Sequence, residues 1–113
     1  MSLPEAERKT DAGAFQLTGT AAGALTAQGP LTFASARRAC ELGVQMLTQT
    51  AGANLEIDCR GITLSDSAGL AVLLEWLGVA RRAGRSLRYT KLPEGLAALA
   101  HISDVQELLE RGV

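Results

Sequence analysis

Four short stretches of the chain alternate apolar with polar residues, which is the pattern of a strand with one buried face. The clearest of them, residues 55–59, places Leu55, Ile57 and Cys59 on the same side. Turn-like residues separate the first two stretches, so we expect these two to form an antiparallel hairpin. The four expected strands cover residues 14–18, 24–28, 55–59 and 86–90.

Apolar residues spaced three or four positions apart predict helices between and after these strands. Phe33, Val44 and Leu47 share one face of the first helix. Thr32 is the expected N-terminal cap of that helix, and Asp104 is the expected cap of the last one. The four expected helices cover residues 33–50, 67–84, 93–100 and 105–111.

This order of elements predicts the fold class. A hairpin followed by strand–helix–strand crossovers gives a mixed β-sheet covered by helices, an α/β fold with about four strands and about four helices. Residues 1–12 are polar and mixed in charge, so we expect a flexible tail there and a single domain over residues 13–113.

Composition narrows the function. Apolar residues make up 47% of the 113 residues, which suits a packed core, and the net charge of −1 gives no electrostatic basis for binding nucleic acid. No apolar run approaches the roughly 20 residues that span a bilayer, and the N-terminus lacks a signal-peptide core, so we expect a cytoplasmic protein. Cys40 and Cys59 lack the spacing of metal ligands, and we expect both to be small buried apolar residues with reduced thiols.

The strand of residues 55–59 and the helix that follows it are joined by a short polar loop. Ser65, Asp66 and Ser67 carry the short side-chain oxygens that cap the first amides of a helix. Gly69 follows them and allows close packing. Loops at the carboxyl ends of such strands commonly carry function in open α/β folds, so this loop is the leading candidate site.

The helix after this loop is apolar on two sides. Its first apolar side faces the expected sheet, and its second side carries Val72, Trp76 and Val79. We expect these three residues to form part of an exposed docking surface, because tryptophan is frequent at interface hot spots. The alternative is that another helix of the same chain covers them.

The loop offers little for catalysis. A serine nucleophile needs a base, and His101 is the only histidine; the Gly-x-Ser-x-Gly pattern and the glycine-rich phosphate-binding patterns are absent. We therefore expect no catalytic residues, metal or cofactor. Ser67 is a candidate for phosphorylation, which the helix dipole favours and the adjacent Asp66 opposes.

Several of these stretches together resemble the STAS domain family, which includes anti-anti-sigma factors. The resemblance is carried by residues 25–32, 55–59, 66–74 and 92–100. It implies the STAS fold over most of the chain. In anti-anti-sigma factors the loop usually reads Asp-Ser-Ser-Gly or Asp-Ser-Thr-Gly, and the second hydroxyl is phosphorylated by an anti-sigma kinase. Here Ala68 stands at that position, which argues against such a switch.

The loop and helix are more similar to the MlaB-like subunit of the Mla phospholipid-transport ABC system. That resemblance implies a non-catalytic subunit that binds the transporter's ATPase subunit through this loop and helix, with Ser67 at the contact. It also implies a location at the inner face of the inner membrane, reached through the partner. The expected partner-binding residues are Ser65, Asp66, Ser67, Ala68, Gly69, Val72, Trp76 and Val79.

Overall fold

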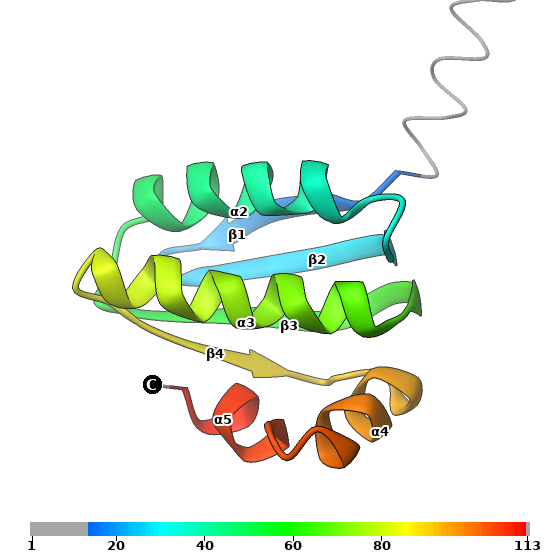
Figure 1. Ribbon diagram of the computed structural model, residues 1–113. Helices are drawn as coiled ribbons and strands as arrows, with labels where there is room; N and C mark the ends of the chain where they lie inside the picture. The colour runs from blue at the N-terminus through cyan, green and yellow to red at the C-terminus, as the bar shows by residue number, and fades with distance from the viewer. Residues whose placement is uncertain (1–13, 113) are drawn as a thin grey trace, which may run out of the picture.

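The computed structural model describes residues 14–112, which form one mixed sheet with helices packed against it (Figure 1). The expected flexible tail, residues 1–12, lies outside the described residues. In chain order the elements are β1 (Gln16–Ala21), β2 (Ala24–Leu31), α2 (Ala36–Gln49), β3 (Asn54–Ser65), α3 (Ser67–Arg82), β4 (Ser86–Thr90), α4 (Glu94–Ile102) and α5 (Gln106–Arg111).

The sheet has the order β1-β2-β3-β4, in which β1 and β2 are antiparallel and the other neighbours are parallel. The predicted hairpin and crossovers are therefore confirmed. Ile57 of β3 lies opposite Leu25 of β2 and Tyr89 of β4, and all three side chains are buried. This row of the sheet faces the core. The hydroxyl of Tyr89 donates a 2.7 Å hydrogen bond to the carbonyl of Leu73, which ties β4 to α3.

Strand β3 is longer than the sequence pattern predicts, because it continues through Arg60 and Gly61 to Ser65. Those two residues interrupt the alternation of buried side chains. The pairing of β3 with β2 shifts register between Thr26 and Gln28, which accommodates the interruption. A period-two pattern does not reveal such an irregularity, so it does not predict the second half of the strand.

The predicted caps of α2 and α5 are both wrong. Helix α2 starts later than expected because residues 32–35 form a turn. The hydroxyl of Ser35 accepts the amide of Thr32 at 2.9 Å and donates to the carbonyl of Pro30 at 2.8 Å. Asp104 has a positive φ of 63° and lies before Val105, which precedes α5 without a side-chain cap.

Helices α2 and α3 lie across one face of the sheet, and α5 packs beside β4 (Figure 1). The opposite face of the sheet is polar. There Arg88 of β4 donates to Glu56 of β3 at 2.9 Å, and the two residues are direct neighbours in the register. Both side chains are well exposed, so this pair adds little stability. The core is thus a single layer between the sheet and the helices.

Trp76 lies at the centre of the helix layer and is fully buried. Its ring is 5.9 Å from that of Phe15, and it contacts the backbone of α2 at Gly43, where an added Cβ would lie 1.8 Å from the indole nitrogen. Val72 and Val79 are buried as well. The expected exposure of these residues is therefore wrong, because the side of α3 that carries them packs against α2.

We predict that Gly43→Ala destabilises the protein by about 1–3 kcal/mol, because a methyl group at this position overlaps the indole of Trp76 and forces α2 away from α3. Urea unfolding followed by circular dichroism measures the loss. Gly95→Ala in α4 is the matched control, because nothing lies within 4 Å of its added Cβ. Equal stability of the two variants would contradict the close approach of α2 to Trp76.

Candidate partner-binding site

Asp66 is the residue that caps α3, as the sequence predicts for this loop. One carboxylate oxygen, Oδ1, accepts the amide of Gly69 at 3.0 Å, which is a standard N-terminal cap. The other oxygen, Oδ2, accepts the amide of Phe33 at 3.0 Å, from the turn between β2 and α2. One side chain therefore joins the start of α3 to the turn that precedes α2.

Both bonds stabilise the ionised form of the carboxyl. The amide of Phe33, followed by that of Gly69, lowers the pKa of Asp66 below its usual value. A carboxylate that accepts backbone amides at a helix N-terminus is also favoured by the helix dipole. Asp66 is therefore a charged structural residue at neutral pH, and both of its oxygens already accept hydrogen bonds.

Ser67, the first residue of α3, differs from its neighbours because it is exposed, whereas Ser65 and Ala68 are half-buried. No side-chain hydrogen bond of Ser67 is found among the residues described, so its hydroxyl is accessible to another molecule. Gly69 is buried, and a Cβ there would lie 2.1 Å from the carbonyl of Leu31. Glycine is thus needed for the close packing of α3 against the end of β2.

Two exposed apolar side chains flank this loop, and neither is among the site residues expected from the sequence. Phe33 is 84% exposed and Leu64 is 64% exposed. The sequence pattern places Phe33 on the buried face of the first helix, but α2 begins three residues later. The pattern gives no signal for Leu64, because it does not predict the end of β3. Together with Ser67 they form what we call the docking tip: Phe33, Leu64 and Ser67.

A shallow apolar groove of about 450 Å³ runs from the start of α3 along its contact with α2. Val72 forms the floor of the groove and is 3% exposed. Of Val72, Trp76 and Val79, which we expected on the docking surface, Val72 is the residue that lines this groove. Ala71 is exposed on its α3 side and Val44 on its α2 side. The residues that line the groove are Ala36, Cys40, Glu41, Val44, Ala68, Ala71, Val72 and Glu75.

Two carboxylates border this groove from opposite helices. Burial, followed by the charges of Glu75 and Glu41, raises the pKa of the Cys40 thiol. Glu75 also lies 3.6 Å from Arg82, in a pair whose side chains are both largely exposed. Cys40 is thus a neutral part of an apolar surface. Burial likewise raises the pKa of Cys59, to about 12, as expected for a reduced thiol in the core.

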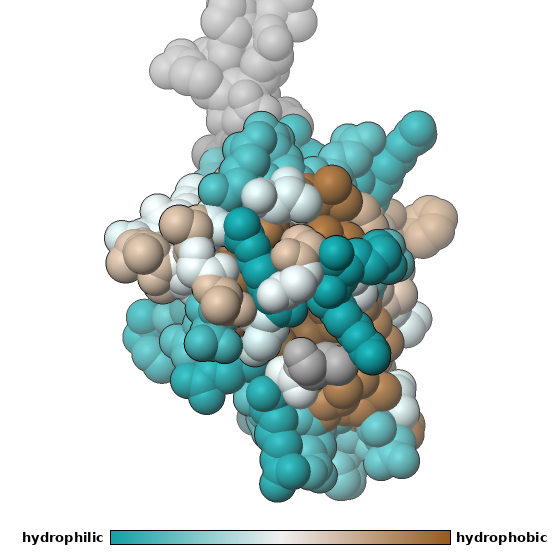
Figure 2. All heavy atoms as spheres, turned by 90° about the vertical axis from the view of Figure 1, so that its left-hand side faces the viewer, coloured by the Kyte–Doolittle hydropathy of each residue, from teal (hydrophilic) through white to brown (hydrophobic). Residues whose placement is uncertain are grey.

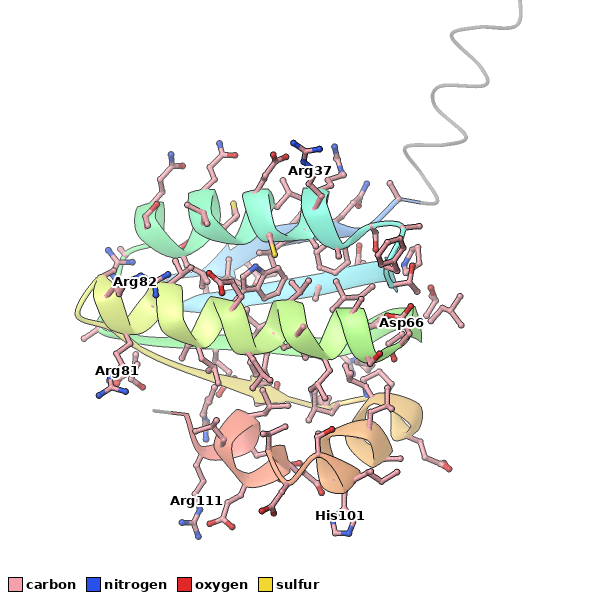
Figure 3. The ribbon with its side chains drawn as sticks, viewed as in Figure 1. Arg37, Asp66, Arg81, Arg82, His101 and Arg111 are labelled. Carbon is pink, nitrogen blue, oxygen red and sulfur yellow. The ribbon has the colours of Figure 1, made fainter. Side chains whose placement is uncertain are left out.

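The opposite end of the molecule has a different character. Figure 2 shows that end, where hydrophilic side chains project around smaller hydrophobic areas. Figure 3 shows Arg81 and Arg82 at the end of α3 that is remote from Asp66. Arg85 donates to the carbonyls of Leu47, at 3.1 Å, and Thr50, so it satisfies the C-terminal end of α2. This arginine therefore has a structural role.

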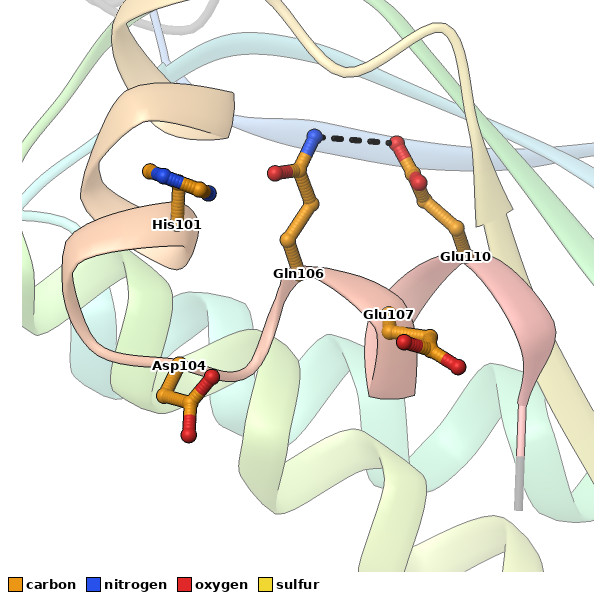
Figure 4. Close-up of a pocket in the computed structure, with 5 residues that line it drawn as sticks. All are labelled: His101, Asp104, Gln106, Glu107 and Glu110. Carbon is orange, nitrogen blue, oxygen red and sulfur yellow. Dashed lines mark hydrogen bonds between the residues drawn. The ribbon is translucent and has the colours of Figure 1, made fainter.

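His101 lines a separate polar pocket of about 500 Å³ between α4 and α5, together with Asp104, Gln106, Glu107 and Glu110 (Figure 4). Gln106 donates to Glu110 across one turn at 3.4 Å. Among the residues described, His101 belongs to this pocket, and no interaction joins it to Ser67. Residues 14–112 contain no cluster of three or more side chains that could hold a metal ion.

Comparison with known families identifies the domain. The family model described as "Mlab, STAS domain" matches residues 15–110. The chain belongs to the STAS family. The match is of the MlaB-like type and includes the whole loop and both helices of the groove. STAS domains are typically non-catalytic regulatory domains that interact with partners.

The fold of this STAS domain is similar to that of the anti-sigma factor antagonist SpoIIAA in its unphosphorylated form. The TM-score is 0.66, with 14% sequence identity over 83% of this chain and 84% of the other. At this identity the likeness shows the fold alone. No curated protein sequence gives a significant match.

Within the described part of this STAS domain, no helix combines the length and the apolar character that a membrane span requires.

The geometry of Asp66 predicts its titration. We expect an NMR titration of its side-chain carboxyl carbon to give a midpoint below the usual value of about 3.9. Because the folded pKa is below the unfolded one, the stability that Asp66 contributes is complete above the unfolded value and is lost as the pH falls through the folded one. The amide signals of Phe33 and Gly69 should follow the same midpoint. A midpoint at or above the usual value would contradict the two hydrogen bonds.

Proposed function

We propose that this STAS domain is the non-catalytic subunit of a Mla-type phospholipid-transport ABC complex, and that it binds and regulates the ATPase subunit of that complex in the cytoplasm. The observation that carries the proposal is the exposed Ser67 at the start of α3, beside an apolar groove, in a chain that matches the MlaB-like STAS model. The domain reaches the inner face of the inner membrane through this partner.

The contact surface of this proposal differs from the one expected from the sequence. It consists of the docking tip and the groove between α2 and α3. Ala71, which is exposed on α3, belongs to this surface. Trp76 and Val79 do not belong to it, because both are buried in the core. The surface combines a free hydroxyl with apolar area and is rimmed by Glu41 and Glu75. An apolar centre with a polar rim is the usual composition of a protein–protein interface.

We predict that Ala71→Arg weakens binding to the purified ATPase subunit of the same organism's Mla-type complex by at least about tenfold, because a long charged side chain fills the groove. Isothermal titration calorimetry measures the affinity. Ala98→Arg is the matched control, because Ala98 is exposed on α4, away from the groove. Ser67→Ala should cost about three- to tenfold through the lost hydrogen bond.

The proposal would be refuted if the unaltered domain failed to bind this ATPase subunit. If it bound but Ala71→Arg and Ala98→Arg had equal effects, the partner would stand and the groove would be wrong. Circular dichroism of each variant distinguishes a lost contact from a lost fold, and both positions are exposed, so the fold is expected to be retained.

A second candidate function is that of an anti-sigma factor antagonist, the activity named for the similar structure of SpoIIAA. The exposed hydroxyl of Ser67 at a helix N-terminus could accept a phosphate, and the dipole of α3 would favour its charge. Ala68 argues against this candidate, because it stands where anti-anti-sigma factors carry the phosphorylated hydroxyl.

We predict that incubation of the domain with ATP and the anti-sigma kinases of the same organism leaves its mass unchanged. Intact-mass spectrometry is the measurement, and Ser67→Ala is the control. Addition of one phosphate to the unaltered domain and not to Ser67→Ala would favour the anti-sigma pathway over the transport complex.

A further inference from the structure

Asp66 makes one hydrogen bond more than a helix cap requires. Its Oδ1 satisfies α3 through the amide of Gly69, and this bond alone would start the helix. Its Oδ2 accepts the amide of Phe33, which lies 33 positions earlier in the chain. Figure 3 shows Asp66 at the end of the molecule where the turn after β2 meets the start of α3. The second bond therefore fixes a loop that belongs to a different element.

The residue fixed in this way is also the most exposed large apolar side chain of residues 14–112. Phe33 is 84% exposed, compared with 80% for Ile102 and 64% for Leu64. The turn that carries Phe33 is further ordered by the hydroxyl of Ser35, which bonds to Thr32 and Pro30. A backbone held at several points beneath a ring that its own chain leaves largely uncovered is the arrangement of a preorganised anchor.

We propose that Asp66 is a positioning residue that holds the turn carrying Phe33 against the start of α3, so that the exposed ring enters an apolar pocket of the ATPase subunit. This inference rests on the proposed function and names the contact that dominates it. An exposed aromatic ring on a turn that is bonded to the start of α3, where the exposed Ser67 lies, suits a pocket with a polar rim, and such rings are typical hot spots of interfaces. Leu64 extends the apolar contact on the other side of the loop.

The variant Asp66→Asn separates the two roles of this side chain. Asparagine caps helices about as well as aspartate, but its side chain has one acceptor oxygen where the carboxylate has two. We expect the variant to keep the bond to Gly69 and to lose the bond to Phe33. In the free domain, amide hydrogen exchange at Phe33 should become about tenfold faster, while that at Gly69 changes by less than about twofold.

Binding measurements to the same purified ATPase subunit test the anchor. We expect Phe33→Ala to weaken binding by at least about tenfold. Ile102→Ala is the matched control, because Ile102 is similarly exposed at the end of α4, and it should stay within about twofold of the unaltered domain. Asp66→Asn should weaken binding when Phe33 is present. It should have no further effect when combined with Phe33→Ala, because Asp66 acts through the ring of Phe33.

The following results would contradict the inference. Equal affinities for Phe33→Ala and Ile102→Ala would overturn the anchor, and faster exchange at Gly69 with no change at Phe33 would overturn the positioning role. If analytical ultracentrifugation showed that Phe33→Ala dissociates a dimer of the domain, the occupant would be a second copy of the chain. Failure of the unaltered domain to bind would refute the proposed function, and the exchange measurement would still test Asp66 separately.

Discussion

The packing of α2 onto the indole of Trp76 is the constraint on which the rest of this structure depends. Gly43 has no side chain, so the backbone of α2 approaches the ring directly, and the two helices lie close enough to cover one face of the sheet together. Each helix follows one of two parallel strands, so their N-termini lie at the same end of the molecule (Figure 1). Only in that arrangement can the carboxylate of Asp66 reach the turn before α2 as well as the first turn of α3.

The function that we propose from this geometry is recognition of another protein. The docking tip and the groove offer a hydroxyl, exposed apolar side chains and a carboxylate that is fully engaged by backbone amides. His101, the only histidine, lines the separate pocket between α4 and α5. Membership of the STAS family fits a regulatory domain, and the fold shared with SpoIIAA agrees with that family.

The sequence is sufficient to predict the order of the elements, because alternation and helical spacing are local properties. It is also sufficient to predict that the loop of residues 65–67 caps α3, and the structure shows that Asp66 is the residue that does so. The sequence is not sufficient to predict the burial of Trp76. A helical wheel shows that α3 has a second apolar side, but it does not show which neighbouring element covers that side. The signal that could decide the question is Gly43, a residue without a side chain in the middle of an apolar helix face. Phe33 is misplaced by the pattern because a three-residue shift of a helix start turns a core position into an exposed one.

The position of the tryptophan has a practical consequence for spectroscopy. The chain contains one tryptophan, and its side chain is buried between two helices and a sheet, about two and a half helical turns from the first residue of α3. Its emission therefore reports whether the helix layer is intact. The docking tip lies at the end of this layer and its residues are exposed, whereas the indole is fully buried, so intrinsic fluorescence reports unfolding more directly than a contact at the docking tip.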